Sequence, residues 1–406
     1  MDQDITIVGA GPAGLGFARM LAGSGLSVAI VDRQSIARIS APAFDGRDIA
    51  LTHQSIRILE HLGAWDRIGD TGRSAIREAR VQDGTSPYTL EFAPGPDTSD
   101  VLGYIVSNHL IRKALYDEVR DLDNVTFVTD ASVSDVRNNA QAATVFLDDG
   151  RALSSRLVIA ADSRYSDTRR MMGIPAEMHD FGRVCIVCRA NIERPHDGIA
   201  FECFHYGRTL AVLPLVGELV SVVITAPMDQ RGAIMDLDQA AFDADLQLRF
   251  GDRLGRMELA SERYAYPLVG VHAARFQARR FALVGDAAVG MHPVTAHGFN
   301  LGLSGAEILA GEVLSAARQE QDIGASELLR RYESRHMRKT RPMYRGTNEI
   351  VRLFTDDRLP VRLARQAVLR MSNNLPPVKR IIRNLLTEPG RPRLPRPPLP
   401  RRATNR

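Results

Sequence analysis

The stretch from residue 281 to residue 302 carries the side chains best placed for chemistry. Phe281–Val284 is an apolar run of strand length, and it ends in Gly285-Asp286, a turn that leaves a carboxylate at the carboxyl end of a strand, where α/β sheets bind ligands. From Gly298 a helical pattern begins, and a helix N-terminus offers free amide N–H groups and a partial positive charge. These features could hold a sugar hydroxyl at one end and a delocalised anion, such as a reduced flavin, at the other.

A glycine-rich motif follows the first predicted strand of the chain. Asp4–Val8 is predicted to be a strand, followed by Gly9-Ala10-Gly11-Pro12-Ala13-Gly14, a helix to about Gly23, and a second strand, Leu26–Val31, that ends in Asp32-Arg33. In this position the first glycine permits a tight turn, the second lets a pyrophosphate approach the backbone, and the third allows close helix–strand packing. The acidic residue after the second strand would accept hydrogen bonds from a ribose. The pattern predicts a dinucleotide site; the alternative is a plain glycine-rich turn.

Both motifs resemble those of a known family. Gly285-Asp286-Ala287-Ala288, then His292-Pro293, then Gly298-Phe299-Asn300-Leu301-Gly302, resembles the second flavin motif of the single-component aromatic hydroxylases. Within that family the wording is most similar to the ubiquinone-biosynthesis hydroxylases, the UbiH/UbiF/UbiM group. Where the family usually has Gly-Gln-Gly before the helix, this chain has Ala296-His297-Gly298, which changes the local loop chemistry and not the cofactor.

The resemblance implies FAD as cofactor, with NAD(P)H as reductant. The cofactor-binding residues that it implies are Gly9, Gly11, Ala13, Gly14, Asp32, Arg33, Arg47, Asn108, Asp162, Asp286, Gly298 and Asn300. The catalytic candidates are His292, Pro293 and His297, of which Pro293 would lie against the ring face. For the two histidines the alternative is hydrogen-bonded loop structure, and for Arg47 it is a solvated charge at the start of a helix predicted over residues 46–63.

A third stretch that resembles the family follows a predicted hairpin. Val145–Leu147 and Ala152–Ala161 are its predicted strands. The segment Asp162-Ser163-Arg164-Tyr165-Ser166-Asp167-Thr168-Arg169 resembles the family's Asp-Gly motif, which serves FAD and the incoming nicotinamide cofactor. Ser163 stands where glycine is usual; it carries about 1–2 kcal/mol of strain if the position needs a positive φ, or else the turn differs. A simple strand-end turn is the alternative.

The order of elements predicts an α/β fold with a doubly wound, Rossmann-like FAD-binding domain, an inserted, mainly antiparallel β-sheet as substrate domain, and a helical C-terminus. The predicted division assigns 1–177 and 271–318 to the FAD-binding domain, 178–270 to the substrate sheet, 319–388 to the C-terminal helical region and 389–406 to a basic, Pro- and Arg-rich tail that is expected to be disordered.

Composition is that of an ordinary soluble globular protein, with 44% hydrophobic and 25% charged residues and no apolar run that approaches the roughly 20 residues of a membrane span. Three cysteines are too few for a disulfide framework, which indicates a reducing cytosol. Cys185 and Cys188 form a C-x-x-C, but strand alternation would send them to opposite faces, so no metal site is predicted.

Charge is distributed unevenly. From residue 331 onward the chain has 20 Lys and Arg against 5 Asp and Glu, whereas the rest has 32 against 43. Residues 378–386 repeat apolar side chains at helical spacing opposite basic ones, and such a helix either lies on an anionic membrane surface or packs on the protein body. We expect a cytoplasmic protein that is peripheral on the inner membrane through this basic arm, and that binds no nucleic acid.

The resemblance implies a monooxygenase that hydroxylates the ring of a polyprenylated phenol or quinol in ubiquinone biosynthesis. NAD(P)H would reduce FAD, O2 would form a C4a-hydroperoxyflavin, and one oxygen would pass to the ring of this lipid-soluble substrate. Other ubiquinone-biosynthesis proteins are the expected protein partners. The alternatives are a flavoprotein hydroxylase of a small soluble aromatic, a prenyl-chain reductase, or a non-catalytic FAD-binding member of a biosynthetic complex.

Overall fold

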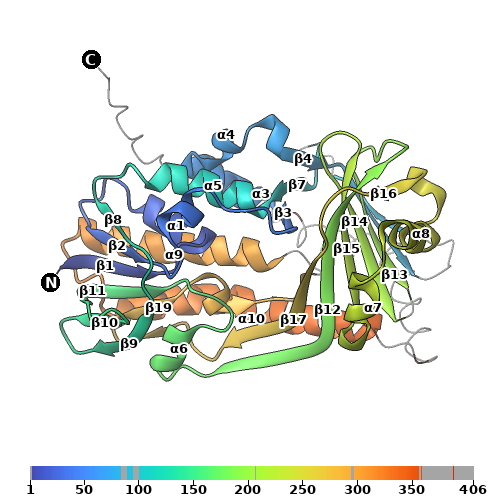
Figure 1. The fold of residues 1–406 in the computed structure, drawn as a ribbon. Coiled ribbons are helices and arrows are strands. Elements are labelled where there is room, and N and C mark those ends of the chain that lie inside the picture. The colour runs from blue at the N-terminus through green and yellow to red at the C-terminus, as the bar shows by residue number, and fades with distance from the viewer. Residues whose placement is uncertain are drawn as a thin grey trace, which may run out of the picture.

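The molecule has two lobes, each built on a β-sheet (Figure 1). The computed structural model describes residues 2–83, 89–94, 100–205, 207–293 and 297–355, together with Arg358 and Thr387. The basic arm at 378–386 and the tail at 389–406 lie outside the described residues. The long strand β12 (Ala176–Ile192) runs from one lobe into the other, antiparallel to β17 (Tyr264–Ala273).

The first sheet is the doubly wound one. Its main path is β18-β19-β11-β1-β2-β8, and the neighbours from β19 to β8 are parallel. Every residue of Val28–Val31 is buried, as expected where helices cover both faces of a parallel sheet. Its strands are β1 (Gln3–Val8), β2 (Val28–Val31), β8 (Val125–Val128), β9 (Val133–Asn138), β10 (Ala143–Leu147), β11 (Ala152–Ala160), β18 (Gln277–Ala278) and β19 (Phe281–Leu283).

The second sheet is mainly antiparallel and follows the path β20-β17-β12-β15-β14-β13-β5-β6, with β16 beside β12. One of its faces packs on α8, and the other faces the first lobe. Its strands besides β12 and β17 are β5 (Glu78–Asp83), β6 (Thr89–Phe92), β13 (Ile199–His205), β14 (Arg208–Pro214), β15 (Leu219–Pro227), β16 (Met257–Leu259) and β20 (Val289–Gly290). A small third sheet joins β3 (Asp48–Leu51), β7 (Gly103–Ser107) and β4 (Arg73–Ile76).

The helices surround the first sheet and cover the outer face of the second (Figure 1). They are α1 (Pro12–Met20), α2 (Ile36–Ser40), α3 (His53–Leu62), α4 (Ala64–Ile68), α5 (Asn108–Val119), α6 (Asp167–Met171), α7 (Arg231–Met235), α8 (Gln239–Phe250), α9 (His297–Arg318) and α10 (Ser326–Thr355). The predicted α/β class, with its parallel core, its antiparallel second sheet and a helical C-terminal part, is confirmed.

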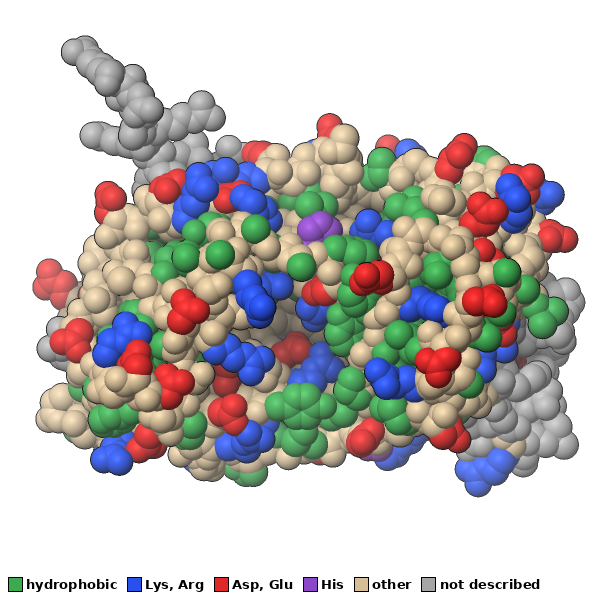
Figure 2. Space-filling view, in the orientation of Figure 1, with side chains coloured by type: hydrophobic (Ala, Val, Ile, Leu, Met, Phe, Trp, Pro, Cys, Tyr) green, Lys and Arg blue, Asp and Glu red, His purple; other side chains and the backbone are tan. Residues whose placement is uncertain are grey.

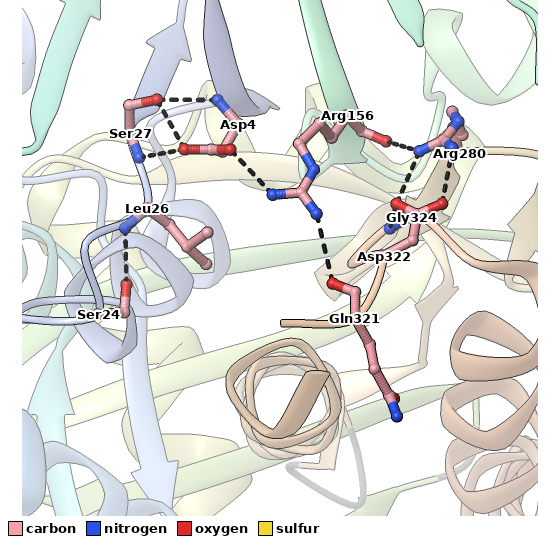
Figure 3. A network of polar contacts seen from close by, with 9 residues as sticks. All are labelled: Asp4, Ser24, Leu26, Ser27, Arg156, Arg280, Gln321, Asp322 and Gly324. Atoms are coloured by element: carbon pink, nitrogen blue, oxygen red, sulfur yellow. Dashed lines mark hydrogen bonds and ion pairs between the residues drawn. The ribbon is translucent and has the colours of Figure 1, made fainter. Parts of the chain in front are cut away.

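A polar network fixes the loop between α9 and α10 to the edge of the first sheet (Figure 3). The Arg280 guanidinium donates to both carboxylate oxygens of Asp322, at 3.0 and 2.7 Å, and to the carbonyl oxygen of Arg156. Arg156 in turn donates to Asp4 of β1. The network therefore holds the long C-terminal helices against the sheet whose carboxyl ends carry the predicted site.

Two details differ from the sequence prediction. The helix predicted over residues 46–63 begins only at His53, because Asp48–Leu51 pairs with β7 as strand β3. β5 and β6 come from the segment assigned to the FAD-binding domain, yet β5 pairs in parallel with β13 of the second sheet. The sequence analysis predicted neither of these two strands, and the domain boundaries stay a prediction.

Candidate active site

The loop between β1 and α1 has the backbone of a phosphate site. Gly9 has a φ of +111°, and a Cβ there would lie 2.4 Å from the carbonyl oxygen of Ala161. A Cβ on Gly14 would lie 2.0 Å from the carbonyl oxygen of Gly9, so both glycines are required by packing. Gly11, just before α1, has no atom within 4 Å of its missing Cβ. A ligand can therefore reach the backbone at the helix N-terminus, where the amide N–H groups attract an anion.

The acidic residue after β2 lies beside this loop. Asp32 accepts hydrogen bonds from the backbone N–H of Ala10 at 2.7 Å and of Gln34 at 2.8 Å. Its carboxylate thus holds the phosphate loop in place and stays partly exposed. Arg33, also predicted to bind cofactor, is exposed next to it.

The two motifs that are almost three hundred residues apart in sequence pack on each other. Gly285 has a φ of +62°, and a Cβ there would lie 2.8 Å from Cβ of Ala13 in α1. A Cβ on Gly302 of α9 would lie 3.0 Å from Cα of Gly285. The N-terminal ends of α1 and α9 therefore meet at the Gly285-Asp286 turn, and one extended ligand can contact both.

Asp286 lies in this turn and forms an ion pair that the sequence analysis did not predict. Its carboxylate accepts a hydrogen bond from Arg164 at 3.0 Å, and Arg164 also donates to the carbonyl oxygen of Val269 in β17. Both side chains of the pair are partly exposed. Figure 2 shows a hollow between the two lobes with acidic and basic side chains in it. Arg164 lies in the motif at 162–169, but the sequence gives no signal of the residue that it contacts.

The motif at 162–169 reaches the same place. Asp162 accepts a hydrogen bond from the Thr168 hydroxyl at 3.1 Å, while its buried Oδ1 atom has no hydrogen-bond partner within the described part of the chain. Arg169 donates to the carbonyl oxygen of Ala287 at 2.9 Å, which ties α6 to the Gly285-Asp286 turn. Ser163 does not have a positive φ, so the turn carries no such strain at this residue.

Arg47 and Asn108 converge on a carboxylate that the prediction missed. Arg47 donates to Asp45 at 3.1 and 2.5 Å, and the Asn108 side chain donates to the same carboxylate at 2.9 Å. Burial would raise the pKa of Asp45, but the hydrogen bonds from Arg47 and Asn108 outweigh it and lower the pKa. The Arg47 guanidinium lies 5.6 Å from the ring centre of Tyr266, on the face of the second sheet that looks towards the first lobe. The sequence offered one signal of this cluster, which is that Asp45 stands two residues before Arg47.

The predicted catalytic residues flank residues 294–296, which lie outside the described part. His292 is buried, and its ring meets Phe181 edge-on at 4.8 Å. Burial, with the positive charge of Arg183 in addition, lowers the pKa of His292 to about 4, so the imidazole is neutral near pH 7. Pro293 is exposed, whereas His297 is buried in the first turn of α9 beside Gly298. Their catalytic role stays a prediction.

Asn300 of α9 forms hydrogen bonds with the turn between β3 and α3, which lies some 250 residues earlier in the chain. Its Oδ1 atom accepts from the backbone N–H of Thr52 at 3.0 Å, and its Nδ2 atom donates to the carbonyl oxygen of Ala50 at 2.9 Å. The side chain therefore joins α9 to the turn between β3 and α3, and its contact with a cofactor stays a prediction.

Comparisons with known proteins agree with this geometry. The family model described as "FAD binding domain" matches residues 2–345. The chain is 48% identical over 392 residues to the ubiquinone hydroxylase UbiM of Neisseria meningitidis, an alignment that covers 95% of this chain and 85% of the relative. This chain belongs to the FAD-dependent hydroxylase family. It is also 35% identical to the ubiquinone hydroxylase UbiL of Rhodospirillum rubrum, over 93% of this chain and 88% of the relative.

The fold of this hydroxylase recurs among solved structures. The p-nitrophenol 4-monooxygenase PnpA from Pseudomonas putida superposes with a TM-score of 0.76 over 95% of this chain and 98% of the neighbour, at 18% sequence identity. Membership of the family makes this protein a flavin-dependent aromatic hydroxylase that uses FAD, with NAD(P)H as reductant. The open backbone at Gly11 and the buried Oδ1 atom of Asp162 fit such a cofactor.

Proposed function

We propose that this hydroxylase acts on the ring of a polyprenylated phenol or quinol in ubiquinone biosynthesis. The observation that carries the proposal is the junction of Ala13, Gly285 and Gly302, which brings a phosphate loop and a second helix N-terminus to one ligand. Relatives with 48% and 35% identity are named ubiquinone hydroxylases, and that agreement supports the substrate class.

The chain's own residues have distinct tasks in this proposal. Gly11 and the N-terminus of α1 hold the pyrophosphate, Asp32 accepts from the ribose, and Asp286 accepts from the ribityl chain. The N-terminus of α9 stabilises negative charge on the flavin ring, with His297 beside it. The chemistry that FAD would supply when bound there is hydride acceptance from NAD(P)H and, with O2, an electrophilic oxygen atom. Arg47 and Asn108 hold the Asp45 carboxylate in place between them.

A lipid-soluble substrate also needs an apolar space. The cluster of Phe204, Leu213, Leu215, Leu102 and Ile105 lies between the inner face of the second sheet and the small third sheet. We propose that the prenyl chain is taken up along this side of the second sheet, because apolar surface there removes it from water.

The substrate's location suggests where the protein works. No helix in the described ranges has the length and hydrophobicity to cross a bilayer. We propose peripheral contact with an anionic membrane through the basic C-terminal region. In support, α10 exposes seven arginines against two glutamates along one side: Arg330, Arg331, Arg335, Arg338, Arg341, Arg345 and Arg352 against Glu327 and Glu349.

The decisive experiment follows O2 and product together. Purified enzyme with FAD, NAD(P)H and a short-chain prenylated phenol should consume O2 in step with NAD(P)H and give a product one oxygen heavier by mass spectrometry. A prenyl-chain reductase would oxidise NAD(P)H without O2 uptake, and a non-catalytic FAD-binding protein would do neither. Hydroxylation of small soluble phenols in preference to prenylated ones would contradict the proposed substrate class.

A further inference from the structure

Strand β13 carries one acidic residue, Glu202, whose side chain lies on the inner face of the second sheet. Phe201 and Cys203 of this strand belong to the apolar core beneath α8. Because successive strand residues point to opposite faces, Glu202 between them points away from that core. The sequence analysis gave this residue no role.

The face that Glu202 shares is the one turned towards the flavin-binding lobe. The strand registers place Glu202 beside Ala211, Ala211 beside Val223, Val223 beside Val187, and Val187 beside Tyr264. At the far end of this row, a Cβ on Gly46 would lie 2.6 Å from the Tyr264 ring and 2.8 Å from Val187. Strands lie about 4.8 Å apart, so the row forms a mostly apolar wall about 19 Å long from the Arg47 segment to Glu202.

The carboxyl group of Glu202 has no partner among the described residues to explain its position. Its neighbours are apolar: Ala200 and Phe204 along β13, and Ala211 and Val81 across it. Neither a hydrogen bond nor an ion pair reaches Glu202 from any residue that the structure describes. The residue is half-buried, and desolvation in these surroundings raises the pKa of Glu202 to about 8. An unpaired carboxyl group in an apolar setting is costly, and an apolar residue would suit a purely structural position better.

The group also lies within electrostatic reach of the flavin side. Burial, with the negative charge of Glu202 in addition and the positive charge of Arg164 in opposition, raises the pKa of Cys185 to about 12. Glu202 and Arg164 therefore both act on Cys185, and the Arg164 side chain donates to Asp286. The other charged or titratable side chains that the alternation and registers place on this face are Asp83, Arg183, Arg189, Tyr264 and Tyr266.

We propose that Glu202 is a catalytic residue that binds the ring hydroxyl of the phenolic substrate and accepts its proton. The proposal rests on the proposed function. The O–H bond of the ring hydroxyl breaks as a carboxyl O–H bond forms, and the electron pair stays on the ring oxygen, where it raises electron density at the ortho and para carbons. After oxygen addition the hydrogen on the attacked carbon leaves as a proton, so the ring regains its aromaticity and its proton count. A group whose pKa lies near the working pH suits this exchange.

A substrate pair and two variants test this role. The probes are a short-chain prenylated phenol and its O-methyl ether, and binding is read from the flavin absorbance of the FAD-loaded enzyme. Wild type should bind the phenol at least tenfold more tightly than the ether, and Glu202→Leu should lose that preference. Glu202→Gln should keep part of it, since the amide still hydrogen-bonds, but lower kcat on the phenol about a hundredfold. Glu258→Gln is the matched control: its side chain is exposed, pairs with Arg256 on another part of the sheet, and the variant should behave as wild type.

Each result decides for or against the role. Equal binding of phenol and ether by wild type, or an unchanged preference in Glu202→Leu, would overturn the proposal, as would an unchanged kcat in Glu202→Gln. FAD content measures folding, and if Glu202→Leu does not fold, the kcat of Glu202→Gln decides. If wild type hydroxylates no prenylated phenol, the proposed function fails, while the binding comparison still decides whether Glu202 recognises a ring hydroxyl.

Discussion

Gly9 and Gly11 of the phosphate loop have different roles, one in folding and one in cofactor binding. A Cβ on Gly9 would strike the carbonyl oxygen of Ala161, and φ is +111° there, whereas the same atom on Gly11 would meet nothing within 4 Å. We predict that Gly11→Ala folds with the same melting temperature as wild type without cofactor but binds FAD at least tenfold more weakly, because its methyl group fills the space for the pyrophosphate. Flavin fluorescence quenching measures the affinity, and differential scanning fluorimetry measures the stability.

Gly9→Ala is the counterpart of this variant. It should lose stability by several kcal/mol even without FAD, since the strain and the clash are present in the protein alone. If Gly11→Ala bound FAD as tightly as wild type, the pyrophosphate would have to lie elsewhere.

A second residue-scale prediction concerns acid stability. His336 of α10 is fully buried against Tyr332 and Phe276, and neither ring nitrogen has a hydrogen-bond partner within the described residues. Burial, with the charges of Lys339 and His272, lowers its pKa from 6.5 to about 3. The unfolded chain therefore takes up a proton below pH 6.5 that the folded chain refuses until about pH 3, so this residue reduces the free energy of unfolding as pH falls through that window.

Replacement of His336 by Phe keeps the aromatic packing and removes the titration. Between pH 7 and pH 5 the free energy of unfolding of His336→Phe should fall by about 2 kcal/mol less than that of wild type. Urea unfolding at the two pH values measures the difference. Parallel pH dependence in both proteins would mean that the imidazole already binds its proton in the folded state.

At the scale of elements, a buried ion pair joins α1 to α5. Arg19 Nε lies 3.1 Å from Glu118 Oε2, both side chains are buried, and Arg67 of α4 pairs with the same carboxylate. Glu118→Gln should reduce the free energy of unfolding by about 3 kcal/mol, because it leaves the Arg19 charge buried without its counter-ion. Lys113→Gln removes an exposed pair with Asp117 on the same helix and should cost less than about 1 kcal/mol. Equal losses in the two variants would contradict the argument.

Elements also show how far the sequence alone could lead. The glycine spacing between β1 and α1 and the Gly-Asp turn after β19 could be read because each signal is local: a strand end, a turn and a helix start lie within a few residues. The link from Asn300 to Ala50 and Thr52 spans some 250 positions, and no local pattern indicates it. The same reason hid the pairing of β5 with β13 and the contact between Arg164 and Asp286.

At the scale of the whole molecule, the site is a product of both lobes. The first lobe supplies the two helix N-termini, and the second supplies the wall from Tyr264 to Glu202. Arg189 of β12 links the two lobes, because its guanidinium forms an ion pair with the Asp48 carboxylate of β3 at 2.8 Å. The flavin ring and the substrate ring would therefore meet between a rigid parallel sheet and an antiparallel one, which excludes water from the reacting atoms.

The basic side of α10 gives the last prediction. Arg338, Arg341 and Arg345 are exposed, and no acidic side chain within the described part pairs with them. Replacement of all three by Gln should weaken binding to vesicles of anionic lipid about a hundredfold at low salt, at roughly 1 kcal/mol for each charge near the surface. Added salt should reduce wild-type binding in the same way. Sedimentation with vesicles measures the bound fraction.

Two further proteins separate the helix from the arm that follows it. Replacement of Arg137, Arg151 and Arg256 by Gln removes three exposed charges from other surfaces and should leave vesicle binding unchanged. A chain that ends before Asn373 lacks the amphipathic segment at 378–386 but keeps α10. If truncation alone abolishes binding, the arm carries the contact; if only the α10 variant loses it, the helix does. Binding by both at the wild-type level would mean that neither α10 nor the arm carries the contact, and would contradict the proposed role of the basic C-terminal region.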